Sequence, residues 1–143
     1  MKKIVVKRAD GGVSIVIPTG EATPELLLRD VLAVEGYVSH REIDDSQLPE
    51  DRVFRDAWTD DLPTDTVDVD IIKAKAIKLD RFRVLRKPLL EKLDVDYLLA
   101  IEKGDKAAQL AVAAQKLVLR DITKIVLPDD VDTLAAFTPK ELL

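Results

Sequence analysis

The sequence predicts an α+β fold: a small antiparallel β-sheet with one covering helix at the N-terminus, an acidic connector, and a C-terminal αα-hairpin. Three observations lead to this prediction. Two β-branched runs flank a Gly-containing turn within residues 3–17, helical periodicity dominates after residue 70, and the residues between carry a strong excess of acids. With 143 residues, the chain has the length of one ordinary domain, or of a small domain with a helical extension.

The first predicted unit, residues 1–48, begins with a β-hairpin. Residues 3–8 and 13–17 are rich in Val and Ile, and residues 9–12 between them contain two glycines, as is typical of a hairpin turn. Pro18 has no amide hydrogen to donate to a β-ladder, so the second strand is expected to end there.

A helix and a third strand are predicted to complete this unit. Thr23 can accept a hydrogen bond from the first free amides of a helix that starts at Pro24, and Gly36 is suited to end it. The face expected to cover the hairpin holds Leu27, Val31 and Val34. Residues 37–43 resume a strand-like pattern.

Residues 49–69 are predicted to form the acidic connector, which contains one short helix. Phe54 and Trp58 are four residues apart, so a helix would present both rings on one face. Two interpretations remain open. The rings either dock the connector on the main core, or Trp58, the only tryptophan, anchors a partner protein.

Residues 70–143 are predicted to form the helical hairpin and a tail. Asp70 is a candidate N-cap, and Pro88 predicts a kink or break of the first helix. The inner side of this helix is expected to hold Ile71, Leu79, Phe82, Leu89 and Leu93.

The second helix of the hairpin has the clearest periodicity in the chain. Gly104 and Asp105 supply a helix stop and a new N-cap, which predicts that the second helix folds back on the first. Its predicted packing stripe consists of Ala107, Leu110, Ala111, Ala114, Leu117 and Val118. A short helix from Asp130 and a terminal helical turn at residues 138–143 are expected in the tail.

The composition excludes several chemistries. The chain has no cysteine, so it can form no disulfide, thiolate metal site or thiol nucleophile. His40 is the only histidine, and the spacing of the five glycines matches no nucleotide-binding loop. The apolar runs are far shorter than the roughly 20 residues of a membrane span, and the apolar run near the start is too short for a secretory signal. We therefore expect a soluble, non-enzymatic protein with no catalytic residue, cofactor or metal.

The aspartates of the connector leave one catalytic hypothesis open. Asp65, Asp68 and Asp70 alternate along the chain after Asp60 and Asp61, and carboxylates alone can bind Mg²⁺ or Ca²⁺. The pattern lacks the central Gly and terminal Glu of a calcium-binding loop. A solvated acidic loop with a helix cap is the favoured interpretation, and a carboxylate-metal hydrolase is the alternative.

The charges are distributed unevenly along the chain. Residues 41–70 hold eleven acids and three arginines, a balance of -8, whereas residues 71–92 hold eight bases and two acids, a balance of +6. The favoured interpretation is that the two stretches face each other or are separately solvated. In the alternative, the basic helix at residues 73–92 binds nucleic acid or a regulatory partner through Arg81, Arg83, Arg86 and Lys87.

Three passages carry a family resemblance. Phe54–Trp58 precedes a basic helix, and Leu89–Tyr97 is followed by Ala114–Ile122. Together they resemble small proteins encoded in the tail modules of tailed phages. The second half is similar to the C-terminal helical region of tail-fibre assembly proteins and tail assembly chaperones, in which an Arg-rich helix leads to a Leu-Leu, Asp and aromatic segment and a later helix ends in Leu-Arg-Asp-Ile. The resemblance covers about residues 52–125.

This resemblance implies a non-enzymatic phage or prophage tail accessory protein that binds other tail proteins, as an assembly chaperone or as a minor structural part. Such a protein would act in the host cytoplasm during assembly or remain in the virion tail. Apolar helix faces would capture the partner, and a homo-oligomer built through the hairpin is consistent with this interpretation. The candidate partner-binding residues are Phe54, Trp58, Arg81, Arg83, Arg86 and Tyr97. Nucleic acid and membrane are not the expected partners.

Overall fold

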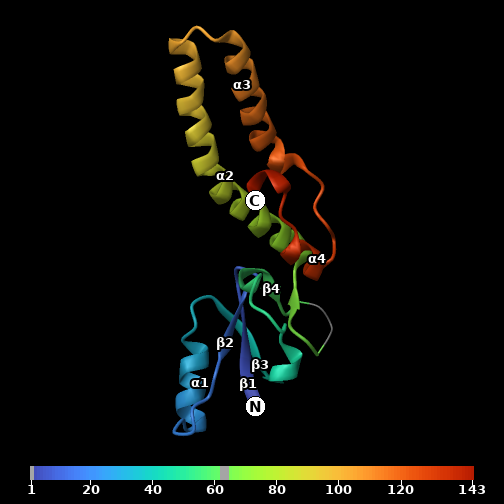
Figure 1. Ribbon diagram of the computed structural model, residues 1–143. Helices are drawn as coiled ribbons and strands as arrows, with labels where there is room; N and C mark the ends of the chain where they lie inside the picture. The colour runs from blue at the N-terminus through green and yellow to red at the C-terminus, as the bar shows by residue number, and fades with distance from the viewer. Residues whose placement is uncertain (1, 62–64) are drawn as a thin grey trace. The chain divides into compact units, whose positions relative to one another are not determined.

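The computed structural model describes residues 2–61 and 65–143 and has the predicted α+β fold (Figure 1). The chain divides into two units, one that extends to Ala74 and one from Lys75 to Leu143. The predicted acidic connector, residues 49–69, lies within the first of these two units. Each unit is described by itself.

A three-stranded antiparallel sheet forms the centre of the first unit. Strand β1 (Lys2–Arg8) lies between β2 (Val13–Val16) and β3 (Tyr37–Asp44). The turn between β1 and β2 uses Gly11 at φ +83°, a conformation that L side chains rarely adopt. The predicted hairpin and third strand are both confirmed.

Helix α1 (Pro24–Leu32) covers one face of the sheet. Thr23 Oγ1 accepts a hydrogen bond of 3.2 Å from the amide of Leu26, which confirms the predicted N-cap. Because successive residues of a strand point to opposite faces, alternate residues of β1 face the helix. Ile4 and Val6 of β1 pack with Val31 of α1, the last being 1% exposed.

The connector covers the opposite face of the sheet. It holds one 3-10 turn, Arg55–Ala57, and two short strands that pair antiparallel, β4 (Trp58–Thr59) and β5 (Asp68–Val69). A second 3-10 turn, Asp45–Gln47, precedes it. The prediction of a short helix that presents Phe54 and Trp58 on one face is wrong, because only the 3-10 turn lies between them and Trp58 begins a strand. An extended ribbon lays side chains from both of its strands over the sheet, and the resulting cluster contains Val5, Val13, Ile43, Trp58 and Val67.

The second unit is built on helix α2 (Ile71–Glu102), whose first turn belongs to the first unit. Asp70 Oδ1 accepts hydrogen bonds from the amides of Ile72 and Lys73, so the predicted cap is confirmed. Helix α2 continues through Pro88 without a break, so of the two outcomes predicted for this residue only a kink remains. Figure 1 shows that the helix changes direction in its yellow-green middle part.

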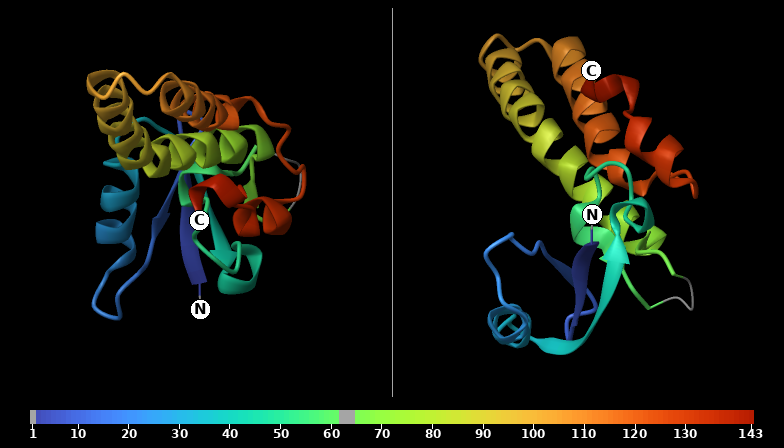
Figure 2. Two further views of the ribbon diagram at one scale, coloured as in Figure 1. Left: turned by 45° about the horizontal axis from the view of Figure 1, so that its top comes forward. Right: turned by 90° about the horizontal axis from the view of Figure 1, so that it is seen from below.

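Helix α3 (Lys106–Asp121) folds back antiparallel to α2, and the two lie side by side in Figures 1 and 2. Gly104, at φ +65°, ends the first helix, and Asp105 Oδ1 caps the second by accepting a hydrogen bond of 3.0 Å from the amide of Ala108. The predicted αα-hairpin is confirmed.

The C-terminal segment packs against the first half of α2. After a 3-10 turn at Ile122–Lys124, helix α4 (Val131–Ala136) buries Leu134 completely, and a last 3-10 turn spans Lys140–Leu142. The ring of Phe137 meets that of Phe82 edge to face, with centroids 6.1 Å apart. The short helix and terminal turn predicted for the tail are confirmed.

Candidate protein-interaction surface

Most of the apolar stripe predicted to pack inside the hairpin lies outside it. Leu110, Leu117 and Val118 are 74%, 56% and 50% exposed. The residues of α3 that line the space next to α2 are Ala108, Val112, Gln115 and Leu119, together with Val118 at one end of the stripe. The helix is therefore rotated about its axis relative to the prediction, and Leu110 and Leu117 of its most regular apolar face are exposed.

The tight turn between the helices fixes this rotation. The amide of Asp105 donates to the carbonyl of Ala100 over 3.0 Å, which ties the start of α3 to the last turns of α2. Farther along, Lys116 forms an ion pair of 2.6 Å with Asp94 and lies 5.5 Å from the ring centroid of Tyr97. These contacts hold one polar side of α3 against α2, so the apolar stripe must face away.

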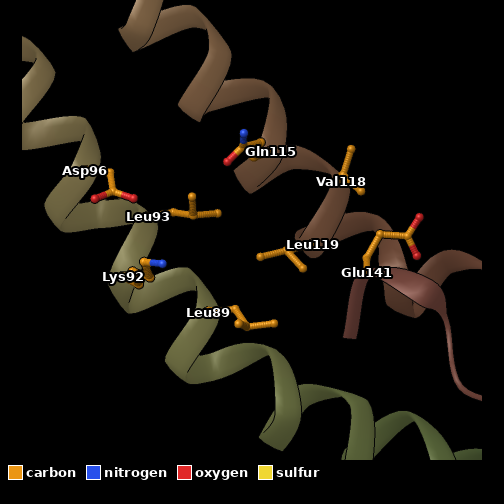
Figure 3. Close-up of a pocket in the computed structure, with 8 residues that line it drawn as sticks. All are labelled: Leu89, Lys92, Leu93, Asp96, Gln115, Val118, Leu119 and Glu141. Carbon is orange, nitrogen blue, oxygen red and sulfur yellow. The ribbon is translucent and has the colours of Figure 1, made fainter. Parts of the chain in front are cut away.

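A groove of about 380 Å³ opens between α2 and α3, which we call the hairpin groove (Figure 3). Leu89 and Leu93 of α2 point toward Leu119 of α3 and form its apolar floor. The remaining lining residues are Lys92, Asp96, Gln115, Val118 and Glu141. The groove thus combines an apolar interior with a rim of both charges, which suits a protein surface better than a single small ion.

Two of the predicted partner-binding residues connect the helices of the hairpin. Arg86 Nη1 donates to the carbonyls of Leu119 and Arg120, over 3.3 and 2.9 Å, and thereby satisfies carbonyls at the end of α3. Tyr97 is half-buried beneath the ammonium group of Lys116. Both side chains lie on the side of the hairpin that carries the ion pair of Lys116, and neither lines the hairpin groove.

Phe54 and Trp58 are buried, with exposed fractions of 2% and 4%. The guanidinium carbon of Arg55 lies 4.5 Å from the centroid of the Trp58 ring, and Arg55 Nη2 donates to the carbonyl of Val13. The prediction that Phe54 and Trp58 anchor a partner protein is corrected here, because both rings are buried inside the first unit. The interpretation that they dock the connector on the core agrees with the structure.

Several of the basic residues between 73 and 92 are paired with acids or buried. Arg83 pairs with Asp80 at 2.5 Å, Lys75 pairs with Asp129, and Lys78 is 6% exposed. Lys78 Nζ donates to the carbonyl of Ala135, and desolvation, helped by nearby Arg81, lowers its pKa below the ordinary lysine value. Arg81 itself is exposed. Phosphate binding needs several free cations on one face, and the pairing of Lys75 and Arg83 and the burial of Lys78 reduce the number available here.

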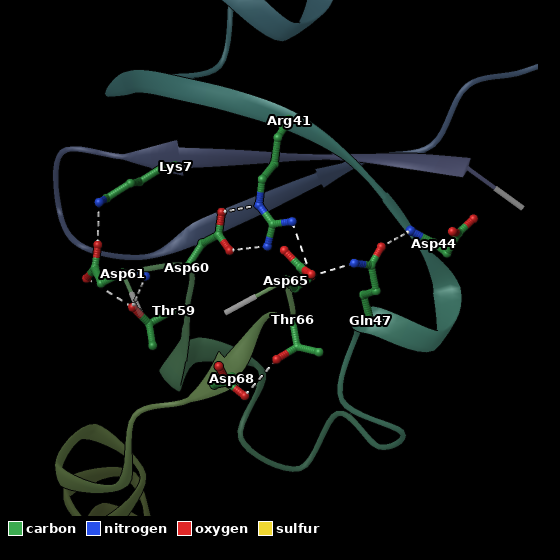
Figure 4. A network of polar contacts seen from close by, with 10 residues as sticks. All are labelled: Lys7, Arg41, Asp44, Gln47, Thr59, Asp60, Asp61, Asp65, Thr66 and Asp68. Atoms are coloured by element: carbon green, nitrogen blue, oxygen red, sulfur yellow. Dashed lines mark hydrogen bonds and ion pairs between the residues drawn. The ribbon is translucent and has the colours of Figure 1, made fainter. Parts of the chain in front are cut away.

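The aspartates of the connector make ion pairs and hydrogen bonds (Figure 4). Arg41 holds the Asp60 carboxylate with two bonds of 2.9 and 2.6 Å, and this contact raises the pKa of the guanidinium. Lys7 pairs with Asp61 at 2.5 Å and, as a hydrogen-bond donor, is the main reason that the Asp61 pKa is lowered. Asp65 contributes its backbone carbonyl to this network. Across residues 2–61 and 65–143, no three His, Cys, Asp or Glu side chains gather closely enough to hold a metal ion.

A second cavity, of about 490 Å³, lies in the first unit beside Trp58. Cations and acids both line it, and Lys3 pairs with Asp45 at 2.7 Å. His40 is exposed and shares a hydrogen bond of 2.8 Å with the hydroxyl of Tyr37.

The sequence correctly identified Leu89 and Leu93 as inner residues but missed Leu119. Leu119 directly follows Leu117 and Val118 of the predicted stripe, so the sequence gives no reason to expect that it alone is buried. The rotation of α3 about its axis decides which of the three residues faces inward.

Searches of protein-family models, curated proteins and solved structures found no match to this chain. Over the described part of the chain, none of the helices has both the length and the apolar character needed to cross a bilayer.

Proposed function

We propose that this protein is a non-enzymatic tail accessory protein of a phage or prophage, which binds another tail protein through the hairpin groove. It would act as an assembly chaperone or as a minor structural part of the tail. The assignment to phage tails rests on the resemblance of residues 52–125, and the binding mode rests on one structural observation. The hairpin groove is open and its floor consists of leucines.

The physical reason for a binding role is that two helices cannot cover each other's apolar surface. Where α2 and α3 run side by side, each covers only one side of the other, so leucines remain partly exposed, such as Leu85 at 47% and Leu89 at 37%. Adjacent exposed apolar side chains with a polar rim are typical of sites that bind a protein. An amphipathic helix of the partner would fit such a groove, and the charges of Lys92 and Asp96 would select its orientation.

Co-expression of the tagged protein with each tail protein encoded beside it tests this proposal. The wild type is expected to retain one of these proteins. Leu89→Glu places a charge in the hairpin groove and is expected to weaken retention by roughly 10-fold to 100-fold, the equivalent of losing one buried leucine. Leu98→Glu is the matched control, because Leu98 is also on α2, is 59% exposed and does not line the groove.

Two results would contradict the proposal. In one, the wild type retains none of the tail proteins. In the other, Leu89→Glu and Leu98→Glu retain the partner equally well, which would show that binding does not use the hairpin groove. Circular dichroism of both variants should show unchanged helix content, since Glu and Leu have similar helix propensities.

A further inference from the structure

The outward face of α3 is apolar over three turns. We call this face the outer stripe. At about 100° per residue, its members fall within an arc of roughly 120°. They are Ala107, Leu110, Ala111, Ala114, Leu117 and Val118. No charged residue falls within this arc between residues 107 and 118. Leu110 and Leu117, 74% and 56% exposed, are its most prominent side chains, and neither lines the hairpin groove.

The outer stripe is symmetric about Ala114. Leu110 and Val118 lie four residues to either side of it, and Ala111 and Leu117 lie three residues to either side. An antiparallel second copy, with its two-fold axis at Ala114, would therefore place Leu110 against Val118 and Ala111 against Leu117. Large side chains then oppose small or medium ones, and the alanine at the axis allows the two helices to approach closely.

The charges at the two ends of α3 favour the same antiparallel arrangement. Lys106 is the first residue of the helix and Asp121 the last, which is the reverse of what the helix dipole favours. In an antiparallel pair, Lys106 would lie beside Asp121 and the C-terminal end of the other helix, so both unfavourable placements would be compensated. A parallel pair would instead bring like charges together.

Neither Lys106 nor Asp121 makes a strong ion pair in the monomer. Asp121 pairs with Lys124 at 2.9 Å, but the two side chains are 45% and 77% exposed, and exposed pairs of this kind contribute little. Lys106 is exposed, and within the described chain no hydrogen bond or ion pair of its side chain is found. Both groups are therefore available to a second copy.

From these observations we propose that the protein self-associates as an antiparallel two-fold dimer through the outer stripes of two α3 helices. The symmetry of the stripe and the reversed end charges identify the occupant as another copy of this chain. A contact between two helices of about 24 Å is smaller than a permanent interface. The dimer is therefore reversible and depends on concentration. The inference does not depend on the proposed function, because the outer stripe shares only Val118 with the hairpin groove.

Sedimentation equilibrium of the full chain tests whether the protein dimerises through the outer stripe. The mass is expected to rise from the monomer value of 15.9 kDa toward twice that value as the concentration increases from about 5 to about 500 µM. Leu110→Glu should remain monomeric over the whole range. Leu98→Glu, which changes an exposed leucine on α2, should associate like the wild type.

A charge-exchange experiment tests the orientation. Lys106→Glu and Asp121→Lys each create like-charge pairs at both ends of an antiparallel dimer, so each variant alone should dimerise several-fold more weakly at low salt. In an equimolar mixture of the two variants, both ends carry opposite charges, and association should return. Each substitution also places a favourable charge at its own helix end, so the monomer fold should be preserved.

A wild type that stays monomeric at the highest concentration would overturn the proposal, as would a Leu110→Glu variant that still dimerises. A mixture that associates no better than the separate charge variants would refute the antiparallel register. None of these outcomes affects the capture of a tail protein by the hairpin groove, which is probed at Leu89 rather than Leu110.

Discussion

Replacing Phe82 with alanine removes the central contact between α2 and the C-terminal segment. The side chain is 1% exposed, and its ring meets Phe137 edge to face at 6.1 Å. Buried phenylalanines truncated to alanine destabilise proteins by about 3–5 kcal/mol, a range that combines lost burial with the cavity left behind. Here the C-terminal segment can shift to fill part of that cavity. We therefore expect the free energy of unfolding to fall by about 3 kcal/mol, the lower end of this range.

Urea denaturation followed by circular dichroism at 222 nm measures this loss, because the second unit holds most of the helical residues. Tryptophan fluorescence follows the first unit separately, since the only tryptophan is Trp58. Val84→Ala is the matched control. Val84 lies two residues from Phe82 on the same helix but is 73% exposed, so its truncation should change stability by no more than about 0.5 kcal/mol.

If Phe82→Ala lowers the free energy of unfolding by less than about 1 kcal/mol, the packing of the C-terminal segment on α2 is refuted. Leu134→Ala provides an independent check from the other side of the same contact. Leu134 is completely buried in α4, and its truncation should cost about 2–5 kcal/mol. If both variants unfold like the wild type, the C-terminal segment contributes nothing to the stability of the unit.

Three further predictions concern the first unit, and unfolding of each variant is followed by tryptophan fluorescence. Gly36→Ala should destabilise by about 1–2 kcal/mol, because Gly36 has φ +75°, whereas Gly20→Ala should be neutral, since nothing lies within 4 Å of the added carbon. Thr23→Ala should cost about 1 kcal/mol through loss of the α1 cap, and a stability within error of the wild type would contradict the cap. The hydrogen bond from Lys7 keeps the pKa of Asp61 below its ordinary value of 3.8. The stability from this pair is therefore present above pH 3.8 and lost as the pH falls through the folded-state pKa, so Lys7→Gln should flatten the acid side of the stability profile.

The elements that the sequence predicted correctly are those specified by local signals. The turn at Gly11, the cap at Thr23 and the stop at Gly104 each depend on residues a few positions apart, and all three occur where the sequence placed them. Such signals act through backbone conformation and short-range hydrogen bonds, so they do not require knowledge of which segments meet in the fold.

The elements that were predicted incorrectly depend on long-range packing. The spacing of Phe54 and Trp58 fits a helix, but burial over the sheet is available only to an extended connector that brings Trp58 and Val67 to the same cluster. Hydrophobic contact outweighs local preference here, because a short isolated helix gains little from its own hydrogen bonds. The rotation of α3 is likewise decided by contacts with α2, such as the ion pair between Lys116 and Asp94, which no pattern within α3 encodes.

The outward position of the most regular apolar stripe links the fold to a binding role. A helix that packed on α2 alone would need only one narrow row of apolar residues, and Ala108, Val112 and Leu119, with Val118 at its edge, provide it. The additional apolar face, with Leu110 as its most exposed member, is not needed for the hairpin and leaves apolar area in contact with water. In the proposed dimer, the amphipathic pattern of α3 is explained by a second copy of the chain, and not by the intrachain packing that the same pattern first suggested.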